Sequence, residues 1–253
     1  MNALEPILAT TRAEVERRRG DALPARDGEL RDFAAALRAP GVSLIAEHKR
    51  RSPSAGAIRE DLTLEDVVAS YQRGGAAALS VLTESSNFGG SLDDLRRARA
   101  ASSLPILRKD FIVDPYQLHE SLAAGADAIL LIVAALEDPN LSALHDLASE
   151  LGLAALVEVH DEHELDRALA VGAALIGINN RDLTTLEVDT RRTFELRARV
   201  PTGKVVVAES GFSRRAELDE LAAAGVDAVL IGEALMRSPR IEPAVRELTA
   251  PTM

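Results

Sequence analysis

Residues 125–132 read GADAILLI, a glycine followed at once by a short apolar run of β-forming residues. Three further segments have the same form: GAAALSVL from Gly75, GAALIGI from Gly172 and GVDAVLI from Gly225. An amphipathic helical pattern precedes each glycine. The sequence therefore predicts four helices that end at a left-handed glycine, each followed directly by a strand.

The spacing of these junctions predicts the fold. The four glycines lie 50, 47 and 53 residues apart, which is the length of two strand–helix units and indicates internal repetition. Eight apolar runs alternate with helical patterns, beginning at Val42, Ala77, Leu104, Asp127, Ala154, Ala174, Lys204 and Asp227. Eight such units predict an α/β chain that closes into a parallel (β/α)8 TIM barrel. The alternative is an open doubly wound sheet, which is disfavoured because no G-x-G-x-x-G motif follows the first run.

The segment before the first strand predicts an N-terminal helical extension. We expect one amphipathic helix at 6–19 and a short helix near 30–37, separated by a polar linker. We expect a single domain over 1–253, with residues 1–41 as the extension and 42–253 as the barrel. The extension is expected to cover part of the barrel.

Composition narrows the class of function. The 253 residues are 47% hydrophobic, which is enough for a substantial core, and the 29 basic and 40 acidic residues give a net charge of −11. That charge argues against a general nucleic-acid binder, so an anionic ligand must be held by a local group. The chain has no cysteine, no signal-peptide pattern and no apolar run of roughly 18 residues. We therefore expect a soluble cytoplasmic protein without membrane contact.

Charged and polar side chains recur where the predicted strands end. In an extended chain alternate residues share a face, so Ile45, Glu47 and Lys49 point one way, as do Leu107 with Lys109 and Leu156 with Glu158. The carboxyl ends of barrel strands meet at one mouth, where barrel enzymes carry their catalytic groups. A solvated strand edge is the alternative for any one of these residues, but it does not explain the recurrence. Converging lysines and glutamates have perturbed pKa values, which predicts proton-transfer chemistry.

Glycine-rich strand ends predict a phosphate site. AESGFS at 208–213 and LIGEALM at 230–236 follow the last two strands, where backbone N–H groups of barrels often bind phosphate. SPSAG at 52–56 adds hydroxyl groups near the same mouth, although an ordinary turn is the alternative for that segment.

Eight segments together resemble the ordered motifs of the indole-3-glycerol phosphate synthase family. They are IAEHKRRSPSAG, SVLTE with a following FGGS, LPILRKDFIVDPYQ, ADAILLIV, LVEVHDE, IGINNRDL, VAESGF and VLIGEALM. The resemblance implies a carboxy-lyase of tryptophan biosynthesis. Its substrate, 1-(2-carboxyphenylamino)-1-deoxyribulose 5-phosphate, closes to indole-3-glycerol phosphate with loss of carbon dioxide and water. The resemblance implies no metal or organic cofactor, and it suggests contact with other enzymes of the same pathway.

The resemblance also implies a role for each matching residue. Lys109 is the general acid of ring closure, and Lys49 binds the substrate carboxylate and assists closure. Glu158 is the base of the dehydration. Glu47, Asn179 and Ser210 position these groups and the substrate. The implied binding residues are Ser52, Gly211, Gly232 and Glu233 for the phosphate, Phe88, Phe111 and Leu130 for the anthranilate ring, and Arg181 for the polar network.

The sequence departs from the family pattern in two loops. Ala55 and the pair Ser85 and Ser86 stand where lysines are common, which affects the expected substrate affinity more than the chemistry. The H-x-x-H spacing of His160 and His163 suggests a metal site as an alternative, but no third ligand is evident and the segment reads as the start of a helix.

Two other functions are alternatives. A Schiff-base aldolase would use Lys109 or Lys49 as a nucleophile. A non-catalytic phosphate-binding barrel would keep the anion site and lack turnover.

Overall fold

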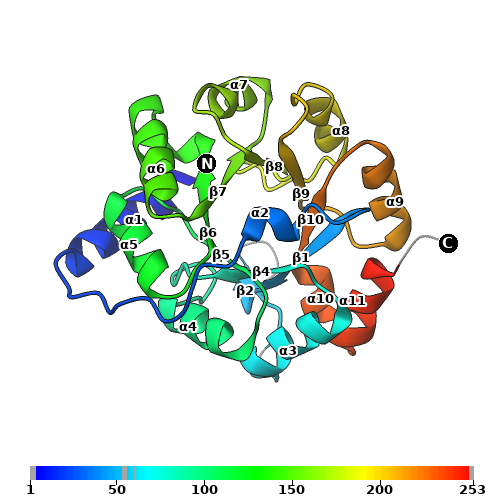
Figure 1. Cartoon of the computed structure of the whole chain (residues 1–253), viewed down its shortest axis with the longest axis horizontal. Coiled ribbons are helices and arrows are strands. Elements are labelled where there is room, and N and C mark those ends of the chain that lie inside the picture. Colours follow the sequence, from blue (N-terminus) through cyan, green and yellow to red (C-terminus); the bar gives the residue numbers. More distant parts are fainter. Residues whose placement is uncertain (1–3, 53–55, 60, 251–253) are drawn as a thin grey trace.

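Eight parallel strands close a barrel, and helices surround it (Figure 1). The structure is a computed structural model, and it describes residues 4–52, 56–59 and 61–250. The barrel strands are β1 (Ser43–His48), β4 (Ala78–Leu82), β5 (Ile106–Lys109), β6 (Ala128–Ile132), β7 (Ala154–Val159), β8 (Leu175–Asn179), β9 (Val205–Glu209) and β10 (Ala228–Ile231). The ladder runs in chain order from β4 to β10, and β1 pairs with both β10 and β4. The predicted TIM barrel is confirmed.

Helices follow the strands around the outside of the barrel. They are α3 (Leu64–Gly74), α4 (Leu92–Ala101), α5 (Pro115–Ala123), α6 (Asp138–Glu150), α7 (Glu162–Ala170), α8 (Arg191–Arg197), α9 (Arg215–Ala223), α10 (Glu233–Arg237) and α11 (Ile241–Thr249). A 3-10 turn, η1 (Val133–Ala135), follows β6, and a small antiparallel pair, β2 (Arg51–Ser52) and β3 (Gly56–Ala57), follows β1. Among the described residues, no helix combines the length and apolar content that crossing a bilayer requires.

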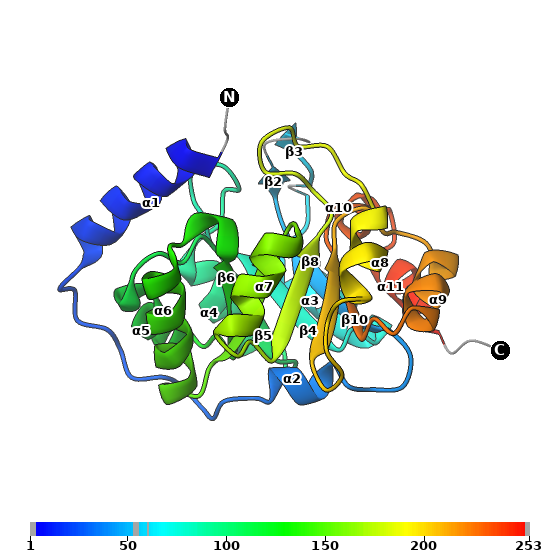
Figure 2. The ribbon, with the colours of Figure 1, turned by 90° about the horizontal axis from the view of Figure 1, so that it is seen from above.

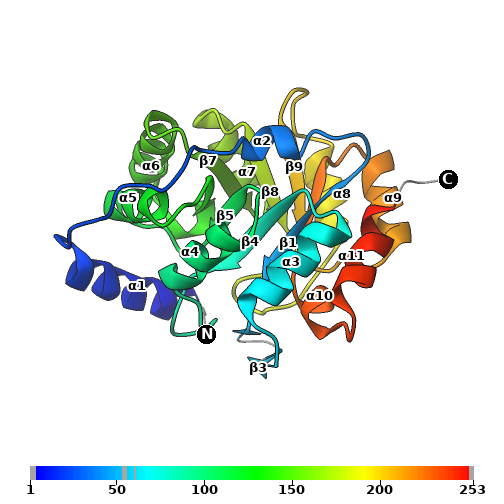
Figure 3. The ribbon, with the colours of Figure 1, turned by 60° about the horizontal axis from the view of Figure 1, so that its bottom comes forward.

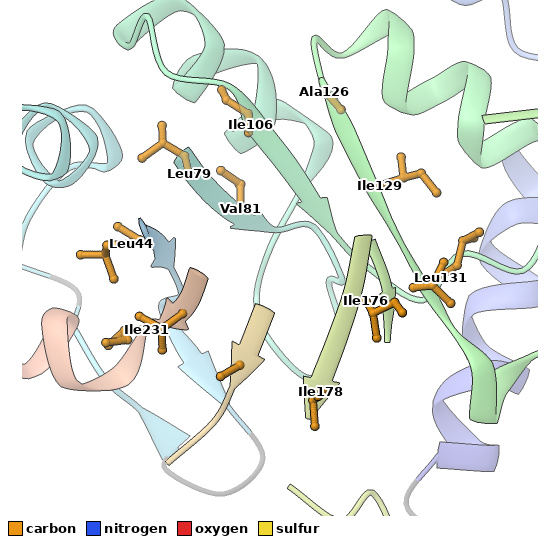
Figure 4. Close-up of a cluster of buried hydrophobic side chains, with 14 of the residues drawn as sticks. Leu44, Leu79, Val81, Ile106, Ala126, Ile129, Leu131, Ile176, Ile178 and Ile231 are labelled. Carbon is orange, nitrogen blue, oxygen red and sulfur yellow. The ribbon is translucent and has the colours of Figure 1, made fainter. Parts of the chain in front are cut away.

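The alternation of side chains along each strand divides the core into two layers. Outward-facing residues such as Leu44, Ile129 and Ile176 pack between the strands and the helices (Figure 4). Inward-facing residues such as Ile45 and Leu107 fill the lumen. The expected parity therefore holds, and the lumen rows lead upward to Glu47, Lys109 and their neighbours at the strand ends.

The four glycines that predicted the barrel have the expected conformation. Gly75, Gly125, Gly172 and Gly225 have φ values of 94°, 94°, 79° and 79°, in the left-handed region where a side chain is unfavourable. Each lies just after a helix and three residues before the first residue of the next strand.

The N-terminal extension contacts both ends of the barrel. Helix α1 (Leu4–Arg18) lies across the side of the mouth, whereas α2 (Phe33–Ala36) lies at the opposite end (Figures 2 and 3). Buried Phe33 closes the lumen there. The second helix is shorter than the predicted 30–37, because the Asp32 side chain accepts a hydrogen bond from the Ala35 N–H and so sets the helix start.

Candidate active site

A cavity of about 140 Å³ lies at the carboxyl ends of the barrel strands. Its walls come from every part of the barrel, as the strand-end pattern predicted. Its polar lining residues are Glu47, Lys49, Lys109, Asp110, Glu158, Asn179, Arg181, Glu209 and Ser210, and its apolar lining residues are Leu82, Phe88, Phe111, Leu130, Ile132, Leu183 and Leu230.

Lys109 is the centre of the polar wall. Its Nζ donates a hydrogen bond to Glu158 Oε2 at 3.1 Å and lies 3.3 Å from Glu209 Oε2. Both carboxylates are 1–2% exposed, and the lysine side chain is 15% exposed. One ammonium therefore joins the ends of β5, β7 and β9 at the edge of the cavity.

The three groups shift one another's pKa values. Burial disfavours a charged lysine, but Glu158, Glu209 and Glu47 outweigh that effect and raise the pKa of Lys109 above its usual range. Burial likewise disfavours ionised Glu158, but Lys109 and His160 hold its pKa well below normal. Burial raises the pKa of Glu209 to about 8, because the charge of Lys109 offsets only part of the cost of ionisation. The site thus holds an ionised and a more easily protonated carboxyl on one lysine.

A second lysine–glutamate pair lies at the end of β1. Lys49 Nζ is 3.0 Å from Glu47 Oε1, and Ser80 of β4 donates to Glu47 Oε2 at 3.3 Å. The absence of a side chain at Gly232 makes room for this carboxylate, since a Cβ there would lie 2.6 Å from Glu47 Oε1. Glu47 is therefore fixed from two sides, and Lys49 extends from it into the cavity.

Asn179 and Ser210 form a hydrogen-bonded pair across β8 and β9. The Ser210 hydroxyl donates to Asn179 Oδ1 at 2.9 Å, and the same oxygen accepts from the Arg181 N–H at 3.0 Å. Ser210 has a φ of 65°, which is unfavourable for a residue with a side chain and is typical of functional positions. The Asn180 side chain donates to the Ser210 carbonyl at 2.9 Å and holds this conformation in place.

The apolar side of the mouth continues into a second cavity of about 230 Å³. Phe88 and Phe111 line both cavities. The second cavity is also lined by Leu4, Pro6 and Ile7 of helix α1. The N-terminal extension therefore supplies apolar surface next to the polar site.

Lysine is rare in this chain outside the mouth. Only three of the 29 basic residues are lysines, and two of them are Lys49 and Lys109. An arginine always stays charged, whereas a lysine is compact and can release its proton. The choice of lysine at these two positions is therefore consistent with acid–base chemistry rather than with charge pairing alone.

Comparisons with known proteins agree on one family. The sequence profile described as "Indole-3-glycerol phosphate synthase" matches residues 4–248. A Streptomyces coelicolor protein, "Indole-3-glycerol phosphate synthase 2", is 50% identical over 242 residues, covering 93% of this chain and 94% of the relative. A Rhodococcus jostii indole-3-glycerol phosphate synthase is 49% identical, covering 98% and 95%. The chain belongs to the indole-3-glycerol phosphate synthase family.

Solved structures of other proteins share the fold alone. A thiamine phosphate pyrophosphorylase from Pyrococcus furiosus aligns with a TM-score of 0.62 and 18% identity, over 84% of this chain and 95% of that one. A chain of the tryptophan synthase α2β2 complex from the same organism aligns with a TM-score of 0.60 and 17% identity, over 83% and 98%. The resemblance to the indole-3-glycerol phosphate synthase family, drawn from eight motifs, is confirmed at the level of the family.

Some residues expected from the family pattern lie outside the cavity wall. Ser52 lines the second cavity, next to Lys49. Gly211, Gly232 and Glu233 follow β9 and β10 but are not among the described residues that line either cavity. The Glu233 carboxylate accepts a hydrogen bond from Arg237 at 2.9 Å. Of the family lysine positions that this chain lacks, Ala55 lies outside the described residues.

The loop after β4 contains the other missing lysine positions, Ser85 and Ser86. Glu84 holds this loop, because its carboxylate accepts hydrogen bonds from the N–H groups of Ser86, Asn87 and Phe88 at 2.7–3.1 Å. The loop therefore presents Phe88 to the cavity through backbone contacts that do not depend on a lysine.

Sequence reasoning left three residues of the site without a role. Glu209 is the last residue of β9, and its position two residues after Val207 places it in a lumen row. Ser80 also follows a lumen residue, Ala78, by two. His160 was considered only with His163 as a metal ligand, yet its imidazole lies between Glu158 and Glu164 while His163 is exposed.

Proposed function

We propose that the cavity around Lys109 catalyses the indole-3-glycerol phosphate synthase reaction. In that reaction 1-(2-carboxyphenylamino)-1-deoxyribulose 5-phosphate loses carbon dioxide and water to give indole-3-glycerol phosphate. The observation that carries the proposal is the contact of one ammonium with two buried carboxylates, Glu158 and Glu209, at the edge of a cavity that also contains Lys49. This arrangement provides an acid, a base and a cation for an anionic substrate.

Ring closure needs an acid at the ketone oxygen. The ring carbon that bears the carboxylate attacks the ketone carbon, and Lys109 donates a proton to the oxygen as the C–C bond forms. Two of the three N–H groups of the ammonium serve Glu158 and Glu209, which leaves one for the substrate oxygen. The positive charge that develops resides on the anilino nitrogen, conjugated with the attacked ring.

Decarboxylation and dehydration follow without a cofactor. The bond to the carboxylate breaks, its electron pair restores the aromatic ring, and carbon dioxide leaves. Glu158 then removes a proton from the carbon beside the nitrogen while the hydroxyl formed in ring closure leaves as water, protonated by a lysine. We assign Lys49 to the substrate carboxylate and to these later proton transfers. Glu47, Asn179 and Ser210 orient the lysine and the substrate hydroxyls.

Binding follows the division of the mouth into apolar and polar sides. We assign Phe88, Phe111 and Leu130 to the anthranilate ring, because they form the apolar wall of the cavity. Arg181 lines both cavities and belongs to the polar network around Asn179. We assign Ser52, Gly211, Gly232 and Glu233 to the phosphate, the glycines and Glu233 mainly through backbone N–H groups.

The Schiff-base alternative is disfavoured by the charge state of Lys109. A lysine that attacks a carbonyl needs a neutral amine and therefore a lowered pKa. At Lys109 burial favours the neutral amine, but the surrounding carboxylates raise the pKa instead. A held ammonium suits proton donation and opposes imine formation.

The test is turnover of the carboxyphenylamino substrate by the purified chain. Because the chain has no tryptophan and two tyrosines, the indole fluorescence of the product rises over a low protein background. Glu158→Gln is expected to lower turnover at least about a hundredfold with the fold intact, a usual size for the loss of a catalytic base. Borohydride added with substrate traps a covalent adduct only in an aldolase. A folded chain that binds the substrate without forming an indole would instead indicate a non-catalytic barrel.

We also place the enzyme in the cytoplasm, with a small phosphorylated molecule as its substrate. Contact with other enzymes of tryptophan biosynthesis stays a prediction, which co-purification of the full chain with those enzymes would test.

A further inference from the structure

His160 lies where strand β7 ends, two residues after Glu158. Its Nε2 is 3.4 Å from Glu158 Oε1, and its Nδ1 is 3.0 Å from Glu164 Oε2. The same Glu164 oxygen accepts a hydrogen bond from the His160 backbone N–H at 2.7 Å. The ring is 10% exposed, so it is fixed between two carboxylates rather than turning freely in solvent.

Glu158 thereby has a basic side chain beside each of its oxygens, as an ion pair at Oε1 and a hydrogen bond at Oε2. Oε1 lies against His160, and Oε2 accepts the hydrogen bond from Lys109. A continuous row of ionisable groups runs from helix α7 to the lumen, in the order Glu164, His160, Glu158, Lys109 and Glu209. A carboxylate with a cation at each oxygen has little freedom to rotate, which is a requirement for a base that acts at one atom.

We propose that His160 is a positioning residue that holds Glu158 Oε1 so that Oε2 stays directed at Lys109 and the substrate, while Glu164 holds the imidazole. The proposal rests on the role of Glu158 as the base of the dehydration. It gives the H-x-x-H segment a function that needs no metal.

The electrostatic surroundings of His160 support this role. The charged groups that face it are Glu158 from β7 and Glu164 from α7, with Lys109 of β5 beyond Glu158. Burial opposes the charged ring, but the two carboxylates raise the pKa of His160 to about 10. His160 is therefore an imidazolium at neutral pH.

That charge has a consequence for the reaction cycle. When Lys109 donates its proton during ring closure, Glu158 loses the ammonium that favours its ionised form. The imidazolium of His160 remains beside Oε1 and keeps Glu158 ionised for the proton abstraction that follows. A base whose only cationic partner was Lys109 would be more easily protonated at the step before it acts.

The test compares three variants with a matched control. His160→Leu removes both contacts, His160→Gln keeps an N–H donor without the charge, and Glu164→Gln removes the charge that holds the ring. His163→Leu is the control, since His163 lies on α7 next to Glu164 and is exposed. We expect His160→Leu to lower kcat by roughly tenfold to a hundredfold, the loss seen when a partner that orients an active-site group is removed. KM should stay nearly constant, and the acidic limb of kcat should move to higher pH. His160→Gln should recover part of kcat but not the pH limb, and Glu164→Gln should show a smaller shift in the same direction.

A structural role would give a different result. Unchanged kcat and pH profile in His160→Leu would overturn the proposal, as would a loss of activity that parallels a loss of folded protein. The charge of His160 has an independent readout, because its imidazole resonances, identified by their absence in the variant, should keep their charged positions above pH 8. Titration of the ring near its ordinary value would also overturn the proposal. If the wild-type chain forms no indole while the resonances behave as expected, the proposed reaction fails and the ionic row stands.

Discussion

Two neighbouring residues of β5, Arg108 and Lys109, carry positive charge to opposite sides of one strand. Arg108 points outward beneath α5 and α1 and is 1% exposed, whereas Lys109 points into the lumen and is 15% exposed. Each is surrounded by buried carboxylates. Burial and ion pairing alone therefore do not distinguish a structural cluster from a reactive one.

All three nitrogens of the Arg108 guanidinium donate hydrogen bonds to protein groups. The guanidinium donates to Asp110 Oδ2 at 2.9 Å, to Thr83 Oγ1 at 3.1 Å, to the Gln117 carbonyl at 2.9 Å and to Ser121 Oγ at 3.0 Å. This engagement leaves the planar guanidinium little capacity for a ligand. This outer cluster joins the barrel to the helices.

The cluster around Lys109 is not saturated. Glu209 Oε1 is buried without a hydrogen-bond partner in the part of the chain that the structure describes, and the lysine faces an open cavity. Cavity size does not mark the difference, because the cavity beside Arg108 is larger, about 390 Å³ compared with about 140 Å³. Unused hydrogen-bonding capacity next to open space, rather than charge or cavity volume, therefore distinguishes the cluster that we propose to be catalytic.

Substitution of Arg108 should have a greater effect on stability than any other change considered below. Arg108→Met leaves Asp110 and Glu120 buried with fewer cationic partners, and the free energy of unfolding should fall by about 3–5 kcal/mol. Urea denaturation followed by circular dichroism measures this change. Turnover of the folded fraction should fall far less than in variants of the mouth.

Arg191→Met is the control for Arg108→Met. Arg191 pairs with Asp189 at the surface, with its side chain 81% exposed, so its loss should change the stability little. A loss of turnover in Arg108→Met as large as that in Lys109→Ala, with the folded fraction intact, would remove the distinction between the two clusters.

The second prediction concerns the loss of turnover when Lys109 is replaced. Lys109→Ala should lower turnover at least about a hundredfold, as expected for the loss of a general acid, with the fold intact. Lys109→Arg should not restore turnover, because a guanidinium does not release its proton and its fork differs from an ammonium. The loss of turnover is measured by quenching the reaction at fixed times and quantifying the indole product for both variants.

Chemical restoration of an amine at position 109 tests the same role of Lys109. Because the chain has no cysteine, Lys109→Cys provides one thiol, and aminoethylation of that thiol restores an amine at nearly the same place. Turnover should rise after the modification and stay unchanged in Lys109→Ala. Lys204→Ala is the control, since this third lysine precedes β9 at the end of the strand away from the mouth, where it donates to the Gly172 carbonyl at 3.4 Å. Near-normal turnover in Lys109→Ala would refute its role as the acid.

Strand periodicity predicts which side of the barrel each cluster occupies. The alternation of residues along β5 and β7 is enough to place Lys109 and Glu158 in the lumen, and the glycine junctions are enough to predict the barrel. Periodicity does not give the partner of a side chain. The contact of Glu209 with Lys109, for example, depends on how β5 and β9 face each other across the closed barrel.

Side-chain contacts between a strand and a helix are harder to predict from the sequence than strand parity. The partners of Arg108 come from α5, which places Gln117 and Ser121 beneath the strand, and no sequence spacing specifies that packing. His160 was visible as part of an H-x-x-H pattern. The orientation of its ring depends on Glu164 one turn into α7, where an i, i+4 relation is evident only once the helix start is known.

A smaller effect tests how tightly the reactive cluster is packed. Gly177 of β8 makes room for Glu209, because a Cβ there would lie 2.3 Å from Glu209 Oε1. Gly177→Ala should push this carboxylate away from Lys109 and cost about 1–3 kcal/mol of stability, the usual range for overpacking. Turnover should fall as well.

A second substitution separates packing from backbone effects at Gly177. In a Glu209→Ala background the added methyl group has space, so Gly177→Ala should cost much less than it does in the wild-type chain. Equal costs in the two backgrounds would mean that the carboxylate is not confined by the strand.

The last prediction concerns how the protonation of Glu209 makes stability depend on pH. Burial raises its pKa from 4.5 to about 8, with Lys109 opposing and Glu158 adding to the shift. Between these two pH values the folded protein binds a proton that the unfolded chain has lost, so this group makes stability fall as pH rises. His48 acts in the opposite sense, because burial lowers its pKa to about 4 and stability then rises with pH from about 4 to 6.5.

Comparison of Glu209→Gln with the wild-type chain isolates the carboxyl, since His48 is common to both. The amide imitates the protonated acid, so the two unfolding free energies should be similar near pH 5 and should diverge in favour of the variant toward pH 8. Below pH 6.5 His160 adds no slope of its own, because both its folded and its unfolded forms are then protonated. A difference that stays constant from pH 5 to pH 8 would mean that Glu209 is ionised throughout. Lys109 would then satisfy its carboxylates as fully as Arg108 satisfies Asp110, and the two sides of β5 would not differ in kind.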